Sequence, residues 1–163
     1  MNVRVDVAAP GSRPCIEALM QLYVYDFSEI MPLDVDEDGH FSPPSLDAYW
    51  SEPGHGAFLI RADDQLAGFA LLEPRSRITD APVNDMAQFF VMRRYRKSGV
   101  GQAAATTLFD RFLGPWEVRQ APVNLAATAF WRRVIERYTS GKFEESVVTD
   151  GTWRGTVQRF VSG

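Results

Sequence analysis

Hydrophobic and polar residues alternate in several short segments of this chain, beginning at its first residues. Val3, Val5 and Val7 recur with the two-residue period of a half-buried strand. Later apolar runs bounded by turn residues predict six more strands, at 57–62, 66–72, 86–92, 116–121, 143–148 and 152–161. Short polar turns join the second strand to the third and the sixth to the seventh, so we expect a β-hairpin at each of these places.

Between these strands the apolar residues change to a spacing of three and four, which predicts helices. The first helix follows Ser12, and its core-facing stripe is expected to comprise Ile16, Leu19, Met20, Tyr23, Val24 and Phe27. A short helix is expected at 46–50, an alanine-rich one at 103–112 and a fourth at 126–138. Strands and helices together predict one mixed α/β domain over residues 1–163.

Composition narrows the possible functions of this domain. Cys15 is the only cysteine among 163 residues, which excludes a disulfide framework and a thiolate zinc cluster, and we expect no metal site. The formal net charge of -4 argues against a nucleic-acid-binding protein. The first residues lack the pattern of a signal peptide, and no apolar run reaches the ~20 residues that span a bilayer. We therefore expect a cytoplasmic protein with a small partner and no membrane partner.

The most informative segment is Arg96-Lys97-Ser98-Gly99-Val100-Gly101, which lies between an apolar strand and an alanine-rich helix. Glycine allows positive φ and a close approach of a ligand to the backbone. A helix start offers unpaired N–H groups and the positive end of the helix dipole. A strand, a glycine turn and a helix in this order are typical of a phosphate-binding site, to which the arginine and the lysine add positive charge.

Two common phosphate-binding motifs do not match this segment. A P-loop requires a lysine after its second glycine, whereas Lys97 precedes both glycines. A dinucleotide-binding turn requires a third glycine where this chain has Ala104, and it opens an early βαβ unit instead of following a hairpin.

Arg96-x-x-Gly99-x-Gly101 instead resembles the Gln/Arg-x-x-Gly-x-Gly/Ala pyrophosphate turn of the GCN5-related N-acetyltransferases, the GNAT family. Downstream, Asn124-x-x-Ala127-x-x-Phe130-Trp131 is similar to that family's Asn-x-x-Ala-x-x-Phe-Tyr segment, and Gly141-Lys142-Phe143 resembles its Gly-Phe step with one residue inserted. The order of the expected elements is similar over nearly the whole chain. This resemblance implies the GNAT fold, a central, mostly antiparallel sheet of six to seven strands flanked by about four helices.

The resemblance also implies acetyl-CoA as the acetyl donor. Its pyrophosphate would be held by backbone amides of the turn, and its arm would run along the preceding strand, where the backbone at Val91 would stabilise the oxyanion of the reaction. The implied cofactor-binding residues are Phe90, Val91, Arg96, Lys97, Ser98, Gly99, Val100, Gly101, Gln102, Asn124, Phe130 and Trp131.

Acetyl transfer to an amine also needs a general base and an acid that protonates the leaving thiolate. The family often uses a tyrosine as this acid, but the matching position here is Trp131, whose indole cannot supply a proton at neutral pH. The nearest phenol is Tyr138, two helical turns further on. We expect Glu73, at the end of an apolar strand, to be the base. The other candidates for the base are Asp85, His40 and His55.

The acceptor is suggested only by charge. The segment from Glu29 to Pro44 has no strand or helix pattern and carries a group of acids, which are Asp34, Asp36, Glu37 and Asp38. If this segment lines the acceptor site, as it commonly does in the resembled family, it would attract a cationic amine. Arg75 and Arg77 would instead favour an acidic acceptor.

The sequence therefore predicts an N-acetyltransferase that transfers acetyl directly from acetyl-CoA to a primary amine of a small molecule or peptide, in a ternary complex. Trp131 leaves a second hypothesis open, a CoA or acyl-CoA binding module of the same fold with little transferase activity. A structural interaction domain that binds no CoA is a third. A homodimer is also expected if aromatic residues of the terminal hairpin are exposed.

Overall fold

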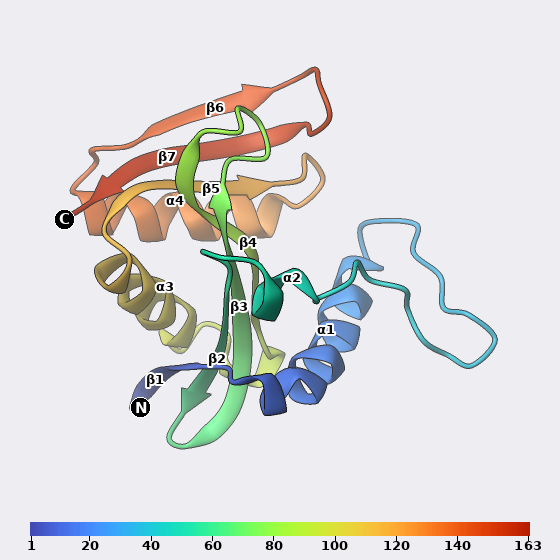
Figure 1. The fold of residues 1–163 in the computed structure, drawn as a ribbon. Helices are drawn as coiled ribbons and strands as arrows, with labels where there is room; N and C mark the ends of the chain where they lie inside the picture. The colour runs from blue at the N-terminus through green and yellow to red at the C-terminus, as the bar shows by residue number, and fades with distance from the viewer.

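The computed structural model describes the whole chain, residues 1–163, and its centre is one seven-stranded sheet (Figure 1). The strands are β1 (Val3–Val7), β2 (Gly56–Ala62), β3 (Gln65–Arg75), β4 (Pro82–Val91), β5 (Gly114–Gln120), β6 (Glu144–Val148) and β7 (Gly155–Ser162). They lie in the order β1-β2-β3-β4-β5-β7-β6. Every neighbouring pair is antiparallel except β4 and β5, which are parallel.

Helices cover both faces of this sheet (Figure 1). They are α1 (Arg13–Phe27), α2 (Ala48–Ser51), α3 (Val100–Arg111) and α4 (Leu125–Thr139), with short 3-10 helices η1 (Pro10–Ser12) and η2 (Arg93–Tyr95). One core lies under α1 and includes Ile16 and Phe69. The larger core lies under α3 and α4 and includes Phe109 and Trp116. The sheet therefore separates two apolar layers.

β4 carries a bulge at Ala87. The pairing with β3 passes directly from Gln88 to Met86, so the alanine has no partner on β3. A bulge bends its strand and increases the local twist. On the other side, β5 pairs with β4 only over residues 84–86. The two parallel strands therefore separate beyond this point, and the edge of residues 87–91 that faces β5 is left unpaired.

Gly68 lets β3 and the end of β4 approach each other closely. A Cβ atom at this position would lie 1.9 Å from the carbonyl oxygen of Phe90, nearer than any side chain tolerates. The glycine thus fixes how the end of β4 lies on β3, and with it the position of the unpaired edge.

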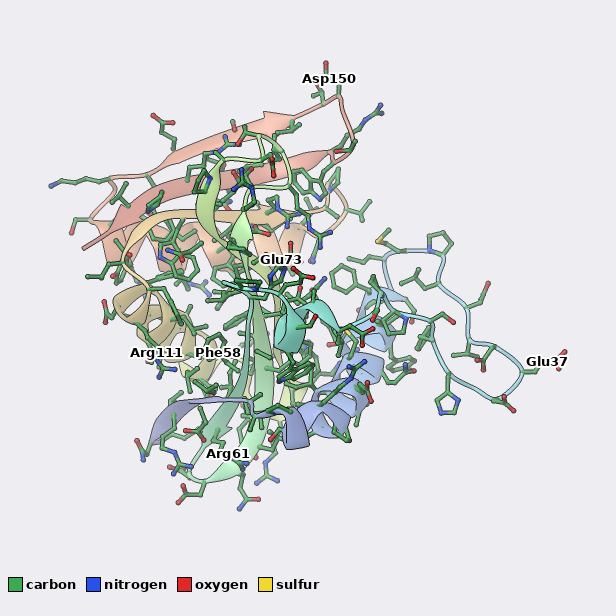
Figure 2. The ribbon with its side chains drawn as sticks, viewed as in Figure 1. Glu37, Phe58, Arg61, Glu73, Arg111 and Asp150 are labelled. Carbon is green, nitrogen blue, oxygen red and sulfur yellow. The ribbon has the colours of Figure 1, made fainter.

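The connection between α1 and α2 projects from the body of the molecule (Figure 1). Its returning half is tied to α1 by Gln21, whose side-chain amide both donates to and accepts from the backbone of Phe41 at 2.9 Å. At the tip, the carboxylate of Asp36 accepts hydrogen bonds from the backbone N–H groups of Asp38 and His40. Figure 2 shows Glu37 at the outer end of this loop.

The predicted fold class is confirmed, with a mostly antiparallel sheet and both hairpins in place. In the terminal hairpin Trp153 is half-buried and Phe160 is buried. None of the helices combines the length and apolar composition needed to cross a membrane. No three His, Cys, Asp or Glu side chains are grouped to hold a metal ion.

Candidate functional site

A cleft of about 830 Å³ lies beside the unpaired edge of β4. It is walled by the second half of α1, the end of β4, the turn before α3 and one side of α4. Tyr23, Phe27 and Phe90 line it from the layer under α1, and Phe89 and Phe130 line it from the layer under α4. The cleft therefore joins the two faces of the sheet, and an extended ligand lying in it would contact both layers.

The backbone groups that β4 offers to the cleft belong to Phe89 and Val91. The N–H of Met92 donates to a carbonyl of β3 at 2.8 Å, and the polar groups of successive residues point to opposite sides of a strand. Phe90 therefore pairs toward β3, in agreement with its carbonyl's close approach to that strand. The backbone of Phe90 thus faces β3, and the residue also lines the cleft.

The turn before α3 presents a run of unpaired backbone donors. The N–H groups of Lys97, Ser98 and Gly99 make no hydrogen bond within the protein. Those of residues 100–102 belong to the first turn of α3, where no carbonyl of the helix can accept them. Positive φ angles of 61° at Lys97 and 88° at Gly99 give the concave backbone that binds anions. This geometry fits a pyrophosphate group.

The side chain of Arg96 is held by other groups of the protein and is not free in the turn. Its Nε donates to the carbonyl oxygen of Val91 at 2.7 Å, and its guanidinium pairs with the carboxylate of Asp26 on α1. Arg93 pairs with the same carboxylate at 2.9 Å. The motif arginine thus braces the turn against β4 and α1, and its charge is balanced by Asp26.

Other cations supply the positive charge of the cleft. Lys97 and Arg133 line it, and neither has an ion-pair partner in the protein. Arg137 lies one turn further along α4 and donates to the side chain of Gln102 at 3.0 Å. The end of the cleft nearest the turn is therefore electropositive, which suits a phosphate-bearing ligand.

The Asn124 segment shapes the other wall. The side chain of Asn124 accepts a hydrogen bond from the N–H of Ala127 at 3.3 Å and so caps the start of α4. Phe130, two positions beyond the first turn, lies on Gly101 of α3, where a Cβ atom would come within 3.1 Å of its ring. Trp131 is 6% exposed and lines the cleft behind it. The spacing of this motif thus combines a helix cap with close packing of α4 on α3.

Tyr138 lies outside the cleft. Its hydroxyl donates to the carboxylate of Asp110 at 2.8 Å, and its ring packs on Phe109 with the ring centres 5.1 Å apart. Burial, followed by the hydrogen bond and charge of Asp110, raises the pKa of Tyr138 to about 12. Tyr138 therefore links α4 to α3 and is not placed to protonate a leaving group, contrary to expectation.

Glu73 does not line the cleft either. Its carboxylate accepts hydrogen bonds from the hydroxyl of Tyr49 at 2.8 Å and from Arg77 at 2.7 Å. Burial opposes ionisation, but the hydrogen bonds from Arg77 and Tyr49 outweigh it and lower the pKa of Glu73. A paired carboxylate of low pKa is a weak general base. The structure thus gives Glu73 a stabilising role at the end of β3 in place of the expected catalytic one.

The alternative bases are no better placed. Asp85 is fully buried and paired with Arg119 through two hydrogen bonds, of 2.8 and 3.2 Å; burial raises its pKa and the guanidinium opposes this. His55 packs edge-on against Tyr49, with 5.5 Å between ring centres. His40 lies on the projecting loop. None of these groups lines the cleft.

The expected acidic mouth is not formed. Of the acids at the end of α1 and in the projecting loop, only Asp26 and Glu29 line the cleft, and Asp26 is paired with two arginines. The carboxylate of Asp36 is engaged in its own turn, and Glu37 points outward at the far end of the loop (Figure 2). Charge in the cleft therefore gives little reason to prefer a cationic acceptor.

Tyr23 is among the residues of the cleft that sequence reasoning did not identify. Tyr23 was expected in the core stripe of α1, and its ring does pack against Phe27, Phe69 and Phe90. Yet the residue also lines the cleft. Helical spacing identifies the inward face of α1 but not which part of that face meets a core and which part meets a cavity, so no signal in the sequence distinguishes this tyrosine from its neighbours.

The separating strands β4 and β5, the turn of free amides and the capped helix α4 thus surround one cleft in an α/β fold. Residues 16–135 match the model of the Acetyltransferase (GNAT) family, and the chain belongs to this family. None of the curated proteins compared with the chain gives a significant match.

Solved structures with the same fold cover nearly the whole chain. An acetyltransferase from Thermus thermophilus superposes with a TM-score of 0.69 at 16% identity, covering 99% of this chain and 97% of its own. A GNAT acetyltransferase from Streptococcus agalactiae 2603 gives 0.69 at 11% identity, covering 99% and 96%. The aminoglycoside acetyltransferase meta-AAC0020 from an uncultured soil metagenomic sample gives 0.63 at 16% identity, covering 93% and 95%. At these identities the likeness concerns the fold.

Proposed function

We propose that this protein is an N-acetyltransferase that transfers the acetyl group of acetyl-CoA directly to a primary amine. One observation carries the proposal: the free amides of residues 97–102 and the unpaired edge of β4 at Phe89 and Val91 lie along one continuous cleft. The pyrophosphate matches the amides, and the amide-bearing arm matches an open strand edge, which can bind an extended ligand as a further strand would.

A backbone donor on the same edge supports the chemistry. The thioester oxygen gains negative charge as the amine attacks, and an N–H group held rigidly in a strand stabilises that charge without rearrangement. Val91 and Phe89 both point such groups toward the cleft. Membership in the GNAT family supports acetyl-CoA as the donor. No protein nucleophile is required, because the amine attacks the thioester itself.

A second candidate function is a CoA or acyl-CoA binding module with little transferase activity. It is favoured by the chain's departures from the expected catalytic set: Trp131 replaces the usual phenol, Tyr138 is bound to Asp110, and Glu73 is paired with Arg77. These departures do not affect the proposed CoA cradle, which consists of the free amides of residues 97–102 and the unpaired edge of β4 at Phe89 and Val91. Binding and turnover must therefore be measured separately.

Calorimetric titration with acetyl-CoA tests the cradle. Gly99→Val should weaken binding at least tenfold, because the turn needs φ of 88° at this position and a β-branched residue resists it. Gly151→Val is the matched control: it imposes the same strain at φ of 96° in the terminal hairpin, remote from the cleft, and should bind as the wild type does. Equal affinity in all three proteins would contradict the proposed cradle.

Release of free thiol from acetyl-CoA, measured with a panel of primary amines, separates the two candidate functions. The panel should include small aromatic amines, polyamines, aminoglycosides and peptides with a free N-terminus. Turnover that saturates with one class supports the transferase. Saturable binding of acetyl-CoA without turnover for any amine would favour the binding module, and no binding at millimolar concentration would reject both.

A further inference from the structure

Tyr23 carries a hydroxyl without a partner in the cleft. No group of the protein forms a hydrogen bond with this hydroxyl. The only fully buried side-chain polar atom without a partner is His55 Nδ1, so the hydroxyl of Tyr23 is not fully buried. Because Tyr23 lines the cleft and its hydroxyl has no partner within the protein, this hydroxyl is available to a ligand.

The ring of Tyr23 is held in place while its hydroxyl is free. Its ring centre lies 4.9 Å from that of Phe27, 5.8 Å from Phe69 and 5.6 Å from Phe90, with the first two contacts edge-on. These contacts come from α1, β3 and β4. A polar atom fixed by packing on three elements is preorganised for binding or catalysis.

Burial keeps the hydroxyl of Tyr23 protonated. Burial raises the pKa of its hydroxyl, and the positive charge of Arg119 on β5 acts in the opposite direction without reversing the shift. Asp26 and Arg96, which line the same cleft, are paired with each other. At neutral pH the hydroxyl is thus a hydrogen-bond donor, and a free phenolate is disfavoured.

Its position matches the reacting end of the ligand arm. The arm would lie along the edge of β4 at Phe89 and Val91, beyond the point where β4 and β5 separate. Tyr23 faces this edge from the layer under α1, and Trp131 faces it from the layer under α4. Of these two side chains only the phenol carries a proton that it can transfer.

We propose that Tyr23 is a catalytic residue that moves the proton from the attacking amine to the leaving sulfur. This inference rests on the function proposed above. As the amine nitrogen forms its bond to the acetyl carbon and the C–S bond breaks, the electron pair of that bond goes to sulfur. The hydroxyl of Tyr23 gives its proton to sulfur and accepts the proton that nitrogen loses. The phenol ends as it began, and the products are the amide and free CoA.

This shuttle takes the place of the acid and the base expected from the sequence, neither of which lines the cleft. Neither Glu73 nor Tyr138 reaches it, and Asp85 is sealed in its pair with Arg119. A shuttle requires only one group that donates and accepts, which a hydroxyl does. It also avoids the phenolate that burial disfavours. The acceptor must then enter as a neutral amine.

A measurement on CoA alone tests the contact independently of the acceptor. CoA is bound to the protein, and the ultraviolet absorbance of its thiolate is followed as the pH rises. A hydrogen bond from Tyr23 favours the thiolate, so Tyr23→Phe should raise the pKa of the bound thiol on the order of one unit. The substitution keeps the ring and removes only a hydroxyl that has no partner in the protein.

Tyr25→Phe is the matched control, since Tyr25 lies on the same helix, is 62% exposed and does not line the cleft. It should leave the thiol pKa unchanged. If Tyr23→Phe binds CoA with the wild-type thiol pKa, the inference is overturned while the proposed function stands. If none of the three proteins binds CoA, the proposed function fails and the inference fails with it.

Kinetics with the best amine of the panel provide a second readout. Tyr23→Phe should lower kcat about 100-fold or more, with the affinity for acetyl-CoA within about threefold of wild type, because proton transfer by a positioned group contributes 10²–10⁴. The wild type should show a solvent isotope effect on kcat that the variant loses. An unchanged kcat in Tyr23→Phe would contradict the shuttle.

Discussion

Single residues decide how closely the elements around the cleft approach. Gly68 admits the carbonyl oxygen of Phe90, and Gly101 admits the ring of Phe130. Gly99 and Lys97 turn the backbone so that its N–H groups stay free. At this scale the shape of the cleft depends on three glycines, which have no Cβ atom, as much as on the side chains that line it.

Gly68→Ala should lower the free energy of unfolding by about 3 kcal/mol, at the upper end of the usual effect of overpacking, because its Cβ would meet backbone atoms that cannot move alone. Gly11→Ala is the control, since a Cβ atom there would meet no other atom within 4 Å and the φ of Gly11 is not positive; it should change stability by less than about 0.5 kcal/mol. Urea denaturation measures both. Wild-type stability in Gly68→Ala would show that β3 and β4 can separate at no cost.

At the scale of elements, the end of β3 is held by a polar cluster and not by apolar packing. Glu73 links Tyr49 of α2 to Arg77 in the turn that leads to β4. Next to it, Asp85 of β4 and Arg119 of β5 form a buried pair across the short parallel contact. These contacts hold β4 and β5 together on one side of the bulge, so that the strands separate only beyond it.

Glu73→Gln should lower the free energy of unfolding by about 1 kcal/mol at pH 7. The effect is no larger because the side chain of Arg77 is exposed and solvent weakens the ion pair. Because the pKa of Glu73 is lowered on folding, its contribution is complete above the ordinary value of 4.5 and is lost as the pH falls through the lowered value. The stabilities of the two proteins should therefore converge in acid. Glu17→Gln, in an exposed pair with Arg13, should change stability by a few tenths of a kcal/mol. A constant difference for Glu73→Gln at all pH values would contradict this role.

At the scale of the whole molecule, the cleft is the place where the two layers meet. Its walls come from α1 on one face, α4 on the other and β4 between them. A ligand that fills it would tie both layers to the sheet. Binding to the folded state alone would therefore stabilise the entire chain.

Acetyl-CoA at 100 times its Kd should add about 2.7 kcal/mol to the free energy of unfolding and raise Tm by about 5–10 °C. Differential scanning calorimetry with and without the ligand measures the shift. At the same ligand concentration Gly99→Val should show a much smaller rise. A wild-type Tm that does not respond to acetyl-CoA would contradict the proposed cradle.

The sequence by itself determined the order of the elements, the mixed α/β class and the position of the glycine turn before α3. These follow from local chemistry: apolar periodicity, the freedom of glycine to take the positive φ that Gly99 adopts, and the Asn124 side chain that caps its own helix. Element ends were less well predicted, because the pairing of Glu73 with Asp85 extends β3 and β4 beyond their apolar runs.

Only the tertiary structure decided which side chains reach the cleft. The charge of Arg96 is balanced by Asp26, 70 positions away, and Tyr138 is turned to Asp110. The bulge at Ala87 depends on the register between two strands, and it determines that Phe89 and Val91 are the residues whose backbone faces away from β3. Tyr23 shares its helical stripe with true core residues. Such placements depend on contacts between distant segments, and the local pattern of a sequence does not contain them.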